Sequence, residues 1–321
     1  MKAEIKAFLN EGGDFGATAL QLYRWQRDNN SEYDRFCGDV VVHHWTQIPA
    51  VPTTLFRDLH FTCFPAHTAN QVFQTSGTTA GRRGAVHLMD TEIYDLSARL
   101  HAEHCLGPLP KKGVSFVPAT TDSSLGHMCA HFVPDMPNFF SAETGVRARD
   151  GWRELTIRAR EGVPLFVPGT AFAFADLLAE CSEPVGLPPG SIVMVTGGFK
   201  GRKRTVPASV LHAQLAAKMP GAQIVGEYGM SELASQLWAI PAGAGFLPPP
   251  WMEVLAVDPW SGAVTDRGLL RFYDLANHQT VLAIETQDVG VVASDGRVHL
   301  EGRLTGAVPR GCSLTVEEVN A

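Results

Sequence analysis

The feature that most constrains the fold is the alternation of short apolar runs with longer helical patterns between residues 71 and 240. The apolar runs, each closed by Gly or Pro, are GVSFVP (113–118), VPLFVP (163–168), SIVMVTGG (191–198) and AQIVGEYG (222–229). Runs rich in Val, Ile or Phe are typical of buried strands. Helical spacing of apolar residues is found at 91–106, 170–181 and 207–219. The alternation therefore predicts an α/β fold with a largely parallel sheet flanked by helices.

The segments on either side of this alternation differ from it in character. Residues 1–70 contain helical and irregular patterns, and we expect them to form a mostly helical segment packed on an α/β core of residues 71–245. Residues 246–305 are short alternating runs broken by SG, DRG and SDG turns, which predict antiparallel hairpins in a small β subdomain. Residues 306–321 form a C-terminal tail.

Charge and cysteine content exclude several classes of protein. The formal net charge is −7, whereas a nucleic-acid surface usually has a basic excess. The N-terminus has no apolar signal-peptide core, and no stretch approaches the ~20 apolar residues of a membrane span. Six cysteines are scattered without a CxxC pair, which is typical of reduced thiols. We therefore expect a cytoplasmic protein with neither a nucleic-acid partner nor a membrane span.

A loop rich in glycine, hydroxyl and cationic side chains, TSGTTAGRRG (75–84), stands before the first helical pattern. The glycines at 77, 81 and 84 let backbone amides approach an anion closely. The polar side chains that suit a phosphate are Thr75, Ser76, Thr78, Thr79, Arg82 and Arg83. The loop predicts a phosphate site that includes Gly77, and the alternative is a polar surface turn.

This loop resembles the TSGTTGxPKG phosphate loop of the acyl-adenylate-forming (ANL) superfamily. Ala80 replaces a glycine, and Arg82 and Arg83 replace proline and lysine, so the cation is kept. A second stretch, GEYGMSELA (226–234), resembles the YGxTE motif of the superfamily. A third, TQDVGVVASDGRVHLEGR (286–303), resembles the stretch that holds the ribose and ends in Gly-Arg. Three motifs in family order make the resemblance specific.

The resemblance implies a role for each of these residues. Tyr228 would present a flat face to adenine, with Glu227 and Gly229 beside it in the nucleotide site. Ser231 would contact the α-phosphate and Glu232 would bind Mg²⁺. The alternative for Ser231 and Glu232 is a helix that begins there, with Ser231 as its cap.

The third motif and the glycines after the strand at 191–198 complete the implied site. Asp288 would accept hydrogen bonds from both ribose hydroxyls, and Arg303 would lie near the ribose or phosphate. The alternatives are a turn aspartate and a surface arginine. The stretches that line the acyl site in relatives contain His127, Met128, Gly197, Gly198 and Phe199.

Within the superfamily, the chain resembles the acyl-protein synthetases of bacterial bioluminescence operons, which activate fatty acid for a reductase complex. Stretches that carry this resemblance include TDSSLGHM (121–128), VPGTAFAFADLL (167–178) and PRGCSL (309–314). The chain stops eighteen residues after Arg303, so we expect it to lack the mobile C-terminal domain and its lysine. Lys200 is the first candidate to replace that lysine. Cys312 matches the cysteine that accepts the acyl group.

These features predict an enzyme, an acyl-adenylate-forming ligase that uses ATP and Mg²⁺. It would activate a fatty or aryl carboxylic acid to acyl-AMP and transfer the acyl group to a thiol, first Cys312 and then a partner protein. Two alternatives stay open. One is a truncated ligase that loads CoA, a carrier protein or an amine directly. The other is a nucleotide-binding scaffold without catalytic activity. The sequence does not identify the acid or the final acceptor.

Overall fold

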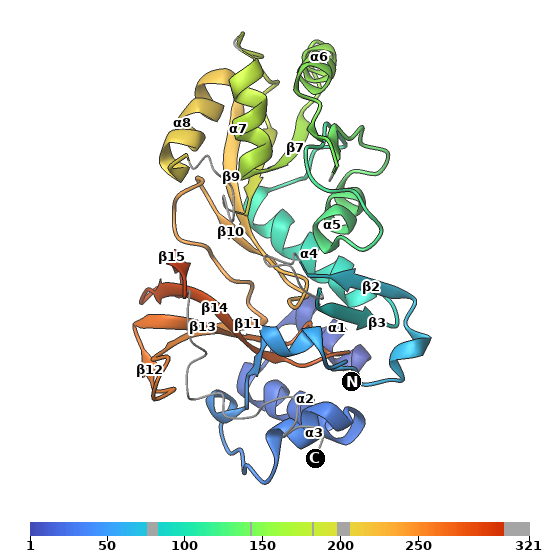
Figure 1. Cartoon of the computed structure of the whole chain (residues 1–321), viewed down its shortest axis with the longest axis vertical. Coiled ribbons are helices and arrows are strands. Elements are labelled where there is room, and N and C mark those ends of the chain that lie inside the picture. Colours follow the sequence, from blue (N-terminus) through green and yellow to red (C-terminus); the bar gives the residue numbers. More distant parts are fainter. Residues whose placement is uncertain (76–82, 142, 182, 198–205, 305–321) are drawn as a thin grey trace. The chain divides into compact units, whose positions relative to one another are not determined.

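The computed structural model describes residues 1–75, 83–141, 143–181, 183–197 and 206–304. It contains two compact units (Figure 1). The first unit comprises Met1–Leu100, Met230–Gln236 and Leu247–Ala321, and the second comprises His101–Gly229 and Leu237–Phe246. The chain therefore passes between the units several times. Residues 71–100 group with the N-terminal helices in the first unit, and the four-segment division drawn from the sequence stays a proposal.

The second unit is built on a five-stranded sheet with the order β10-β9-β8-β7-β4. Its strands are β4 (Lys112–Gly113), β7 (Leu165–Thr170), β8 (Ser191–Thr196), β9 (Ala222–Tyr228) and β10 (Leu237–Ala239). The pairs β4/β7, β7/β8 and β8/β9 are parallel, and only β10 runs antiparallel to its neighbour. The run at 113–118 contributes only Gly113 to β4, and Ser115 and Phe116 pair through isolated bridges. The predicted parallel sheet is confirmed.

Helices accompany the strands of the second unit, and three of them match the helical patterns predicted at 91–106, 170–181 and 207–219, whereas the two between residues 124 and 159 were not predicted. The helices are α5 (Ser124–Phe132), α6 (Ala148–Ala159), α7 (Ala171–Glu180) and α8 (Ala208–Lys218), and α4 (Glu92–Leu106) begins in the first unit. A small hairpin is formed by β5 (Phe140–Ser141) and β6 (Gly145–Val146). α7 and α8 lie alongside each other (Figure 1). None of the helices within the described ranges is long and apolar enough to cross a membrane.

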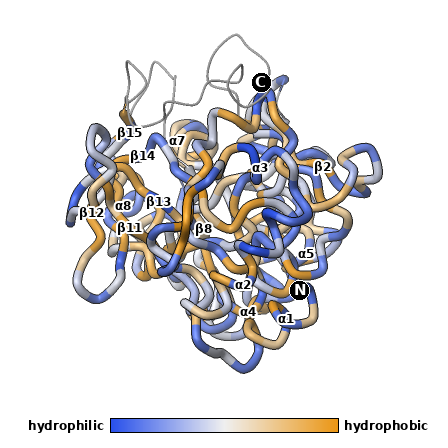
Figure 2. Tube along the Cα trace, turned by 90° about the horizontal axis from the view of Figure 1, so that it is seen from below, coloured by the Kyte–Doolittle hydropathy of each residue, from blue (hydrophilic) through white to orange (hydrophobic). Residues whose placement is uncertain are grey.

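The core of the second unit lies between one face of this sheet and helices α6, α7 and α8. Alternate strand residues such as Val167, Val193 and Val195 form a buried cluster with residues of these helices. Phe166 points to the opposite face, where its ring centroid lies 6.0 Å from that of Phe132 on α5. Both faces are thus covered, which is why β8 is hydrophobic along its length (Figure 2).

The first unit contains a six-stranded sheet with the order β1-β14-β13-β11-β12, in which β15 also pairs with β14. Its strands are β1 (Val51–Pro52), β11 (Met252–Val257), β12 (Val264–Thr265), β13 (Arg267–Asp274), β14 (Ala283–Val292) and β15 (Val298–Arg303). All of its pairs are antiparallel except β1/β14. The antiparallel hairpins expected after residue 246 are therefore present.

The N-terminal segment of the first unit is mostly helical. It contains α1 (Lys2–Glu11), α2 (Phe15–Asn29), α3 (Ser31–Cys37), η1 (Trp45–Gln47), η2 (Thr53–Arg57) and η3 (Ala66–Thr68). A hairpin of β2 (Gln71–Gln74) and β3 (Ala85–Leu88) follows. Asp14 and Asn30 cap α2 and α3 by accepting hydrogen bonds from Ala17 N and Tyr33 N, which explains where these helices begin.

Candidate active site

The glycine-rich loop is held at both ends by the β2–β3 hairpin. Thr75 N–H donates to the Gly84 carbonyl at 2.9 Å, and Gly84 N–H donates to Thr75 Oγ1 at 3.0 Å. A Cβ on Gly84 would lie 3.1 Å from the Phe56 carbonyl oxygen, so this position leaves little room for a side chain. Arg83 is exposed. The first and last residues of the predicted phosphate loop are therefore fixed next to each other.

Several predicted site residues lie outside the described residues. In the glycine-rich loop these are Ser76, Gly77, Thr78, Thr79 and Arg82, and elsewhere in the chain they are Gly198, Phe199, Lys200 and Cys312. Their roles stay predictions.

The second motif meets the glycine-rich hairpin within the first unit. Ser231 Oγ donates a hydrogen bond to the carbonyl of Gln74, the last residue of β2, at 3.0 Å. The next residue, Glu232, is buried, with 8% of its surface exposed. The chain turns at Ser231 and enters β10 six residues later, at Leu237, so the alternative of a helix beginning there is wrong. Two motifs that are 157 residues apart in sequence are joined directly.

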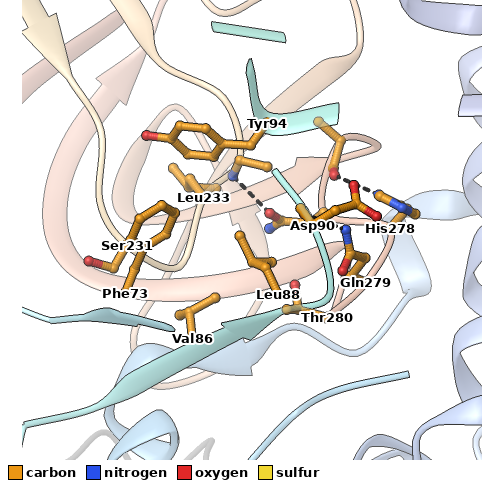
Figure 3. A pocket seen from close by; sticks show the side chains of 13 residues that line it. Phe73, Val86, Leu88, Asp90, Tyr94, Ser231, Leu233, His278, Gln279 and Thr280 are labelled. Atoms are coloured by element: carbon orange, nitrogen blue, oxygen red, sulfur yellow. Dashed lines mark hydrogen bonds between the residues drawn. The ribbon is translucent and has the colours of Figure 1, made fainter. Parts of the chain in front are cut away.

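A small pocket lies beside Ser231 in the first unit (Figure 3). It is lined by Phe73, Val86, Leu88, Asp90, Tyr94, Ser231, Leu233, Ala234 and residues 276–280. Burial lowers the pKa of His278 in this lining to about 4, so its imidazole is neutral at physiological pH. The cavity of about 20 Å³ holds about one water molecule, so it is too small for a nucleotide.

Two buried amide side chains of this lining hold the surrounding segments. Asn277 accepts a hydrogen bond from Ala234 N–H at 2.8 Å and donates one to the Glu232 carbonyl at 2.9 Å. Gln279 accepts from Met89 N–H at 2.6 Å and donates to the Asp90 carbonyl at 2.9 Å. Sequence reasoning missed both residues, since a polar run between two strands is typical of an exposed turn.

A buried polar network fixes the end of the same segment. Ser235 Oγ donates to Asp274 Oδ1 at 2.8 Å and lies 2.8 Å from Ser97 Oγ, while Trp251 Nε1 is 3.0 Å from both hydroxyl oxygens. Among the described residues, Asp274 Oδ2 has no hydrogen-bond partner. Burial raises the pKa of Asp274 to about 7, although the hydrogen bond from Ser235 opposes this shift.

The third motif brings Asp288 and Arg303 together across a strand pair. The two residues are register partners in β14 and β15, and Arg303 Nε lies 3.9 Å from Asp288 Oδ1. Arg303 Nη2 also donates to Gln287 Oε1 at 3.0 Å. The Asp288 side chain is 13% exposed, so it keeps some access to solvent. The two residues predicted to surround a ribose are thus neighbours.

In the second unit, polar side chains form a row where the parallel strands end. Thr170, Thr196 and Glu227 are successive register partners in β7, β8 and β9, and Trp238 of β10 is opposite Glu227. Thr196 Oγ1 donates to Glu227 Oε2. Burial raises the pKa of Glu227 to about 7, and the hydrogen bond from Thr196 acts in the opposite direction. Sequence reasoning identified Glu227 but missed Thr196.

The remaining predicted residues of the second unit that the structure describes lie at the end of β9, on α5 and after β8. Tyr228 ends β9, and its ring centroid lies 5.9 Å from that of Phe246, while Gly229 follows it half-buried. His127 and Met128 lie on α5, where Met128 is 1% exposed. Gly197 follows β8 with a φ of +66°, a conformation that favours glycine.

No protein-family model matches this sequence, and no curated protein matches it. Solved structures do match the fold. ATP-bound MatB from Rhodopseudomonas palustris aligns with a TM-score of 0.52 and 17% identity, over 75% of this chain and 49% of that chain. O-succinylbenzoate CoA synthetase (MenE) from Bacillus subtilis, in complex with AMP, aligns with a TM-score of 0.52 and 17% identity, over 74% and 50%.

A luciferase-like enzyme from the mealworm Zophobas morio aligns with a TM-score of 0.54 and 15% identity, over 76% of this chain and 60% of that chain. About three quarters of this chain therefore shares its α/β fold with these enzymes. The chain spans about half to three-fifths of the length of the structures it matches.

Proposed function

We propose that this protein is an acyl-adenylate-forming ligase that uses ATP to activate a carboxylic acid. The observation that carries the proposal is the hydrogen bond from Ser231 Oγ to the Gln74 carbonyl, at the base of the glycine-rich hairpin. Two stretches that resemble the nucleotide-binding motifs of one superfamily are thereby joined. The match in fold to ATP-bound and AMP-bound enzymes supports the same conclusion.

The first half-reaction is displacement at the α-phosphorus of ATP. A carboxylate oxygen of the acid attacks this phosphorus, the bond to the bridging oxygen breaks, and pyrophosphate leaves, so that acyl-AMP is formed. Thr75 and Arg83 would donate a hydrogen bond or charge to the phosphates, and Ser231 would donate its hydroxyl proton to them once that proton turns from the Gln74 carbonyl to the nucleotide. Asp288 would accept from the ribose hydroxyls, with Arg303 beside it to orient its carboxylate. No side-chain base is required, because the acid is already ionised.

Glu232 fits a magnesium site that is completed by the nucleotide. No group of three or more His, Cys, Asp or Glu residues in the described ranges could hold a metal by itself. Mg²⁺ usually binds through one or two carboxylates together with substrate phosphates, so a single enclosed carboxylate is sufficient. When bound, the ion neutralises charge on the phosphate oxygens.

The second half-reaction transfers the acyl group to a thiol. The thiolate sulfur attacks the acyl carbon, the bond between this carbon and the phosphate oxygen breaks, and AMP leaves. Cys312 is the proposed first acceptor, from its resemblance to the acyl-protein synthetases, followed by a partner protein. Lys200 is the proposed cation near the reacting groups.

Acid-dependent exchange of labelled pyrophosphate into ATP, measured over a panel of fatty and aryl acids, tests the first half-reaction. We expect exchange with at least one acid and a loss of ~10²-fold in Ser231→Ala, the size typical of removing one donor to developing charge. Thr68→Ala is the matched control, since it removes a hydroxyl that donates to a backbone carbonyl at 2.7 Å elsewhere in the first unit. Absence of exchange with every acid would favour the scaffold alternative.

Labelled acid and ATP test the second half-reaction. We expect label to remain on the denatured protein and to be lost in Cys312→Ala. Exchange without retained label would instead favour direct loading of CoA, a carrier protein or an amine.

A further inference from the structure

Asn277 fixes the backbone that carries Ser231 and Glu232. Its Oδ1 accepts from Ala234 N–H at 2.8 Å and its Nδ2 donates to the Glu232 carbonyl at 2.9 Å, so the two bonds span Leu233. Asn277 is 5% exposed, and Leu233 is 1% exposed. Solvent therefore competes little for these bonds, and the orientation of two successive peptide groups is set by one side chain.

The same turn also holds the chain that leaves the glycine-rich hairpin. We call residues 277–280 the amide turn. Gln279 forms two hydrogen bonds, with Met89 N–H and the Asp90 carbonyl, immediately after the end of β3. One four-residue turn is therefore bonded to the segment that carries Ser231 and Glu232 and to the chain that leaves the glycine-rich hairpin.

The amide turn is itself fixed by helix α2. Gln26 Nε2 donates to the Asn277 carbonyl at 2.8 Å, and Gln26 Oε1 accepts from Leu282 N–H at 2.9 Å. Gln26 is fully buried. The turn thus has a defined position against α2, and its hydrogen bonds relate that position to residues 232–234 and to residues 89–90.

We propose that Asn277 is a positioning residue for acyl-adenylate formation, which holds Ser231 and Glu232 in place at the glycine-rich hairpin before nucleotide binds. This inference rests on the proposed function. An amide is required because it must accept on one side of Leu233 and donate on the other. A carboxylate of the same shape can accept from Ala234 N–H, but it would repel the Glu232 carbonyl.

Asn277→Asp tests this proposal. We expect the maximal rate of acid-dependent exchange to fall ~10- to 100-fold, because small displacements of positioning groups have effects of this size. The Mg²⁺ concentration for half-maximal rate should rise several-fold, since Glu232 moves, while KM for the acid should stay within about twofold. A merely structural role would lower Tm without changing the maximal rate per folded molecule or the Mg²⁺ dependence.

Asn138→Asp is the matched control in the second unit. Asn138 also forms two backbone hydrogen bonds, accepting from Phe140 N–H at 2.7 Å and donating to the Val117 carbonyl at 2.8 Å. We expect this variant to lose thermal stability without a change in the Mg²⁺ dependence. If Asn277→Asp behaves in the same way as Asn138→Asp, the proposal is overturned.

Two further measurements keep the proposal separate from the proposed function and from misfolding. If the unmodified protein shows no exchange, the proposed function fails, and calorimetric binding of ATP at several Mg²⁺ concentrations then tests Asn277. An equal Kd in both proteins would overturn the positioning role. If Asn277→Asp does not fold, amide hydrogen exchange of the unmodified protein tests whether residues 232–235 are already held in place without nucleotide. Protection of residues 232–235 without nucleotide supports the proposal, and protection only with ATP and Mg²⁺ overturns it.

Discussion

The two units hold their segments in different ways. In the second unit, helices α6, α7 and α8 cover the sheet through a continuous apolar cluster. In the first unit, the segment 230–236 is held by the buried polar side chains Asn277, Asp274 and Ser97. Apolar packing is strong but non-directional, whereas each hydrogen bond sets a distance and an angle. The difference teaches that directional hydrogen bonds position the segment with the proposed phosphate and metal contacts, whereas the buried apolar area stabilises the sheet of the second unit.

The largest loss of stability should come from a substitution that leaves a cavity in the apolar cluster of the second unit. Phe174 on α7 is fully buried, its ring lies 6.0 Å from that of Phe116, and a Cβ at Gly169 would be 2.5 Å from it. We expect Phe174→Ala to lower the free energy of unfolding by roughly 3–5 kcal/mol in urea titrations. Phe172 lies on the same helix but is half-buried, so Phe172→Ala should lower the free energy of unfolding clearly less. Equal losses would show that burial does not determine the stability of this unit.

The next largest effect should come from the polar network of the first unit, which should make the free energy of unfolding depend on pH. Because the pKa of Asp274 is raised to about 7 in the folded protein, the unfolded chain loses this proton first, and stability falls as pH rises from about 4 to about 7. Asp274→Asn removes this dependence. The free energy of unfolding of the variant, relative to that of the parent, should therefore rise by up to roughly 1.4 kcal/mol per pH unit in that window. Asp266→Asn, at an exposed position, is the control for losing a carboxylate. A difference that is constant with pH would contradict the expectation.

The smallest effect should come from the exposed face of α6. Arg153 has a side chain that is 76% exposed, and it pairs with Asp150 at 3.5 Å. We expect Arg153→Ala to change the free energy of unfolding by less than about 0.5 kcal/mol, because exposed ion pairs contribute little. A larger loss, measured by urea titration in high and low salt, would show that charge on this helix matters to the unit.

The sheet of the second unit was predictable from the sequence because its strands are buried on both faces. β7, β8 and β9 coincide with the apolar runs to within a few residues, since such runs have no polar alternation to obscure them. The run at 113–118 forms a shorter strand than expected, because its residues after Gly113 pair only through isolated bridges. A pattern of apolar residues predicts burial, but it does not determine where the pairing ends.

The polar contacts of the first unit could not be predicted from the sequence. Asn277 and Gln279 lie in a polar run between two strands, yet both are at least nine-tenths buried. Their partners, Glu232 and Met89, are distant in sequence, and no periodicity specifies which backbone a side-chain amide will bond. The three motifs were identified, and the Ser231–Gln74 contact and the Asp288–Arg303 pair became visible only in the fold.

The two hydrogen bonds between Thr75 and Gly84 have a consequence for evolution and engineering. They hold Thr75 and Gly84, the first and last residues of the predicted phosphate loop, next to each other at the end of the β2–β3 hairpin. For a flexible loop, doubling the length costs only about 0.6 kcal/mol of closure entropy. Insertions that keep the predicted phosphate-binding residues should therefore cost little stability, and the strands on either side should keep their register.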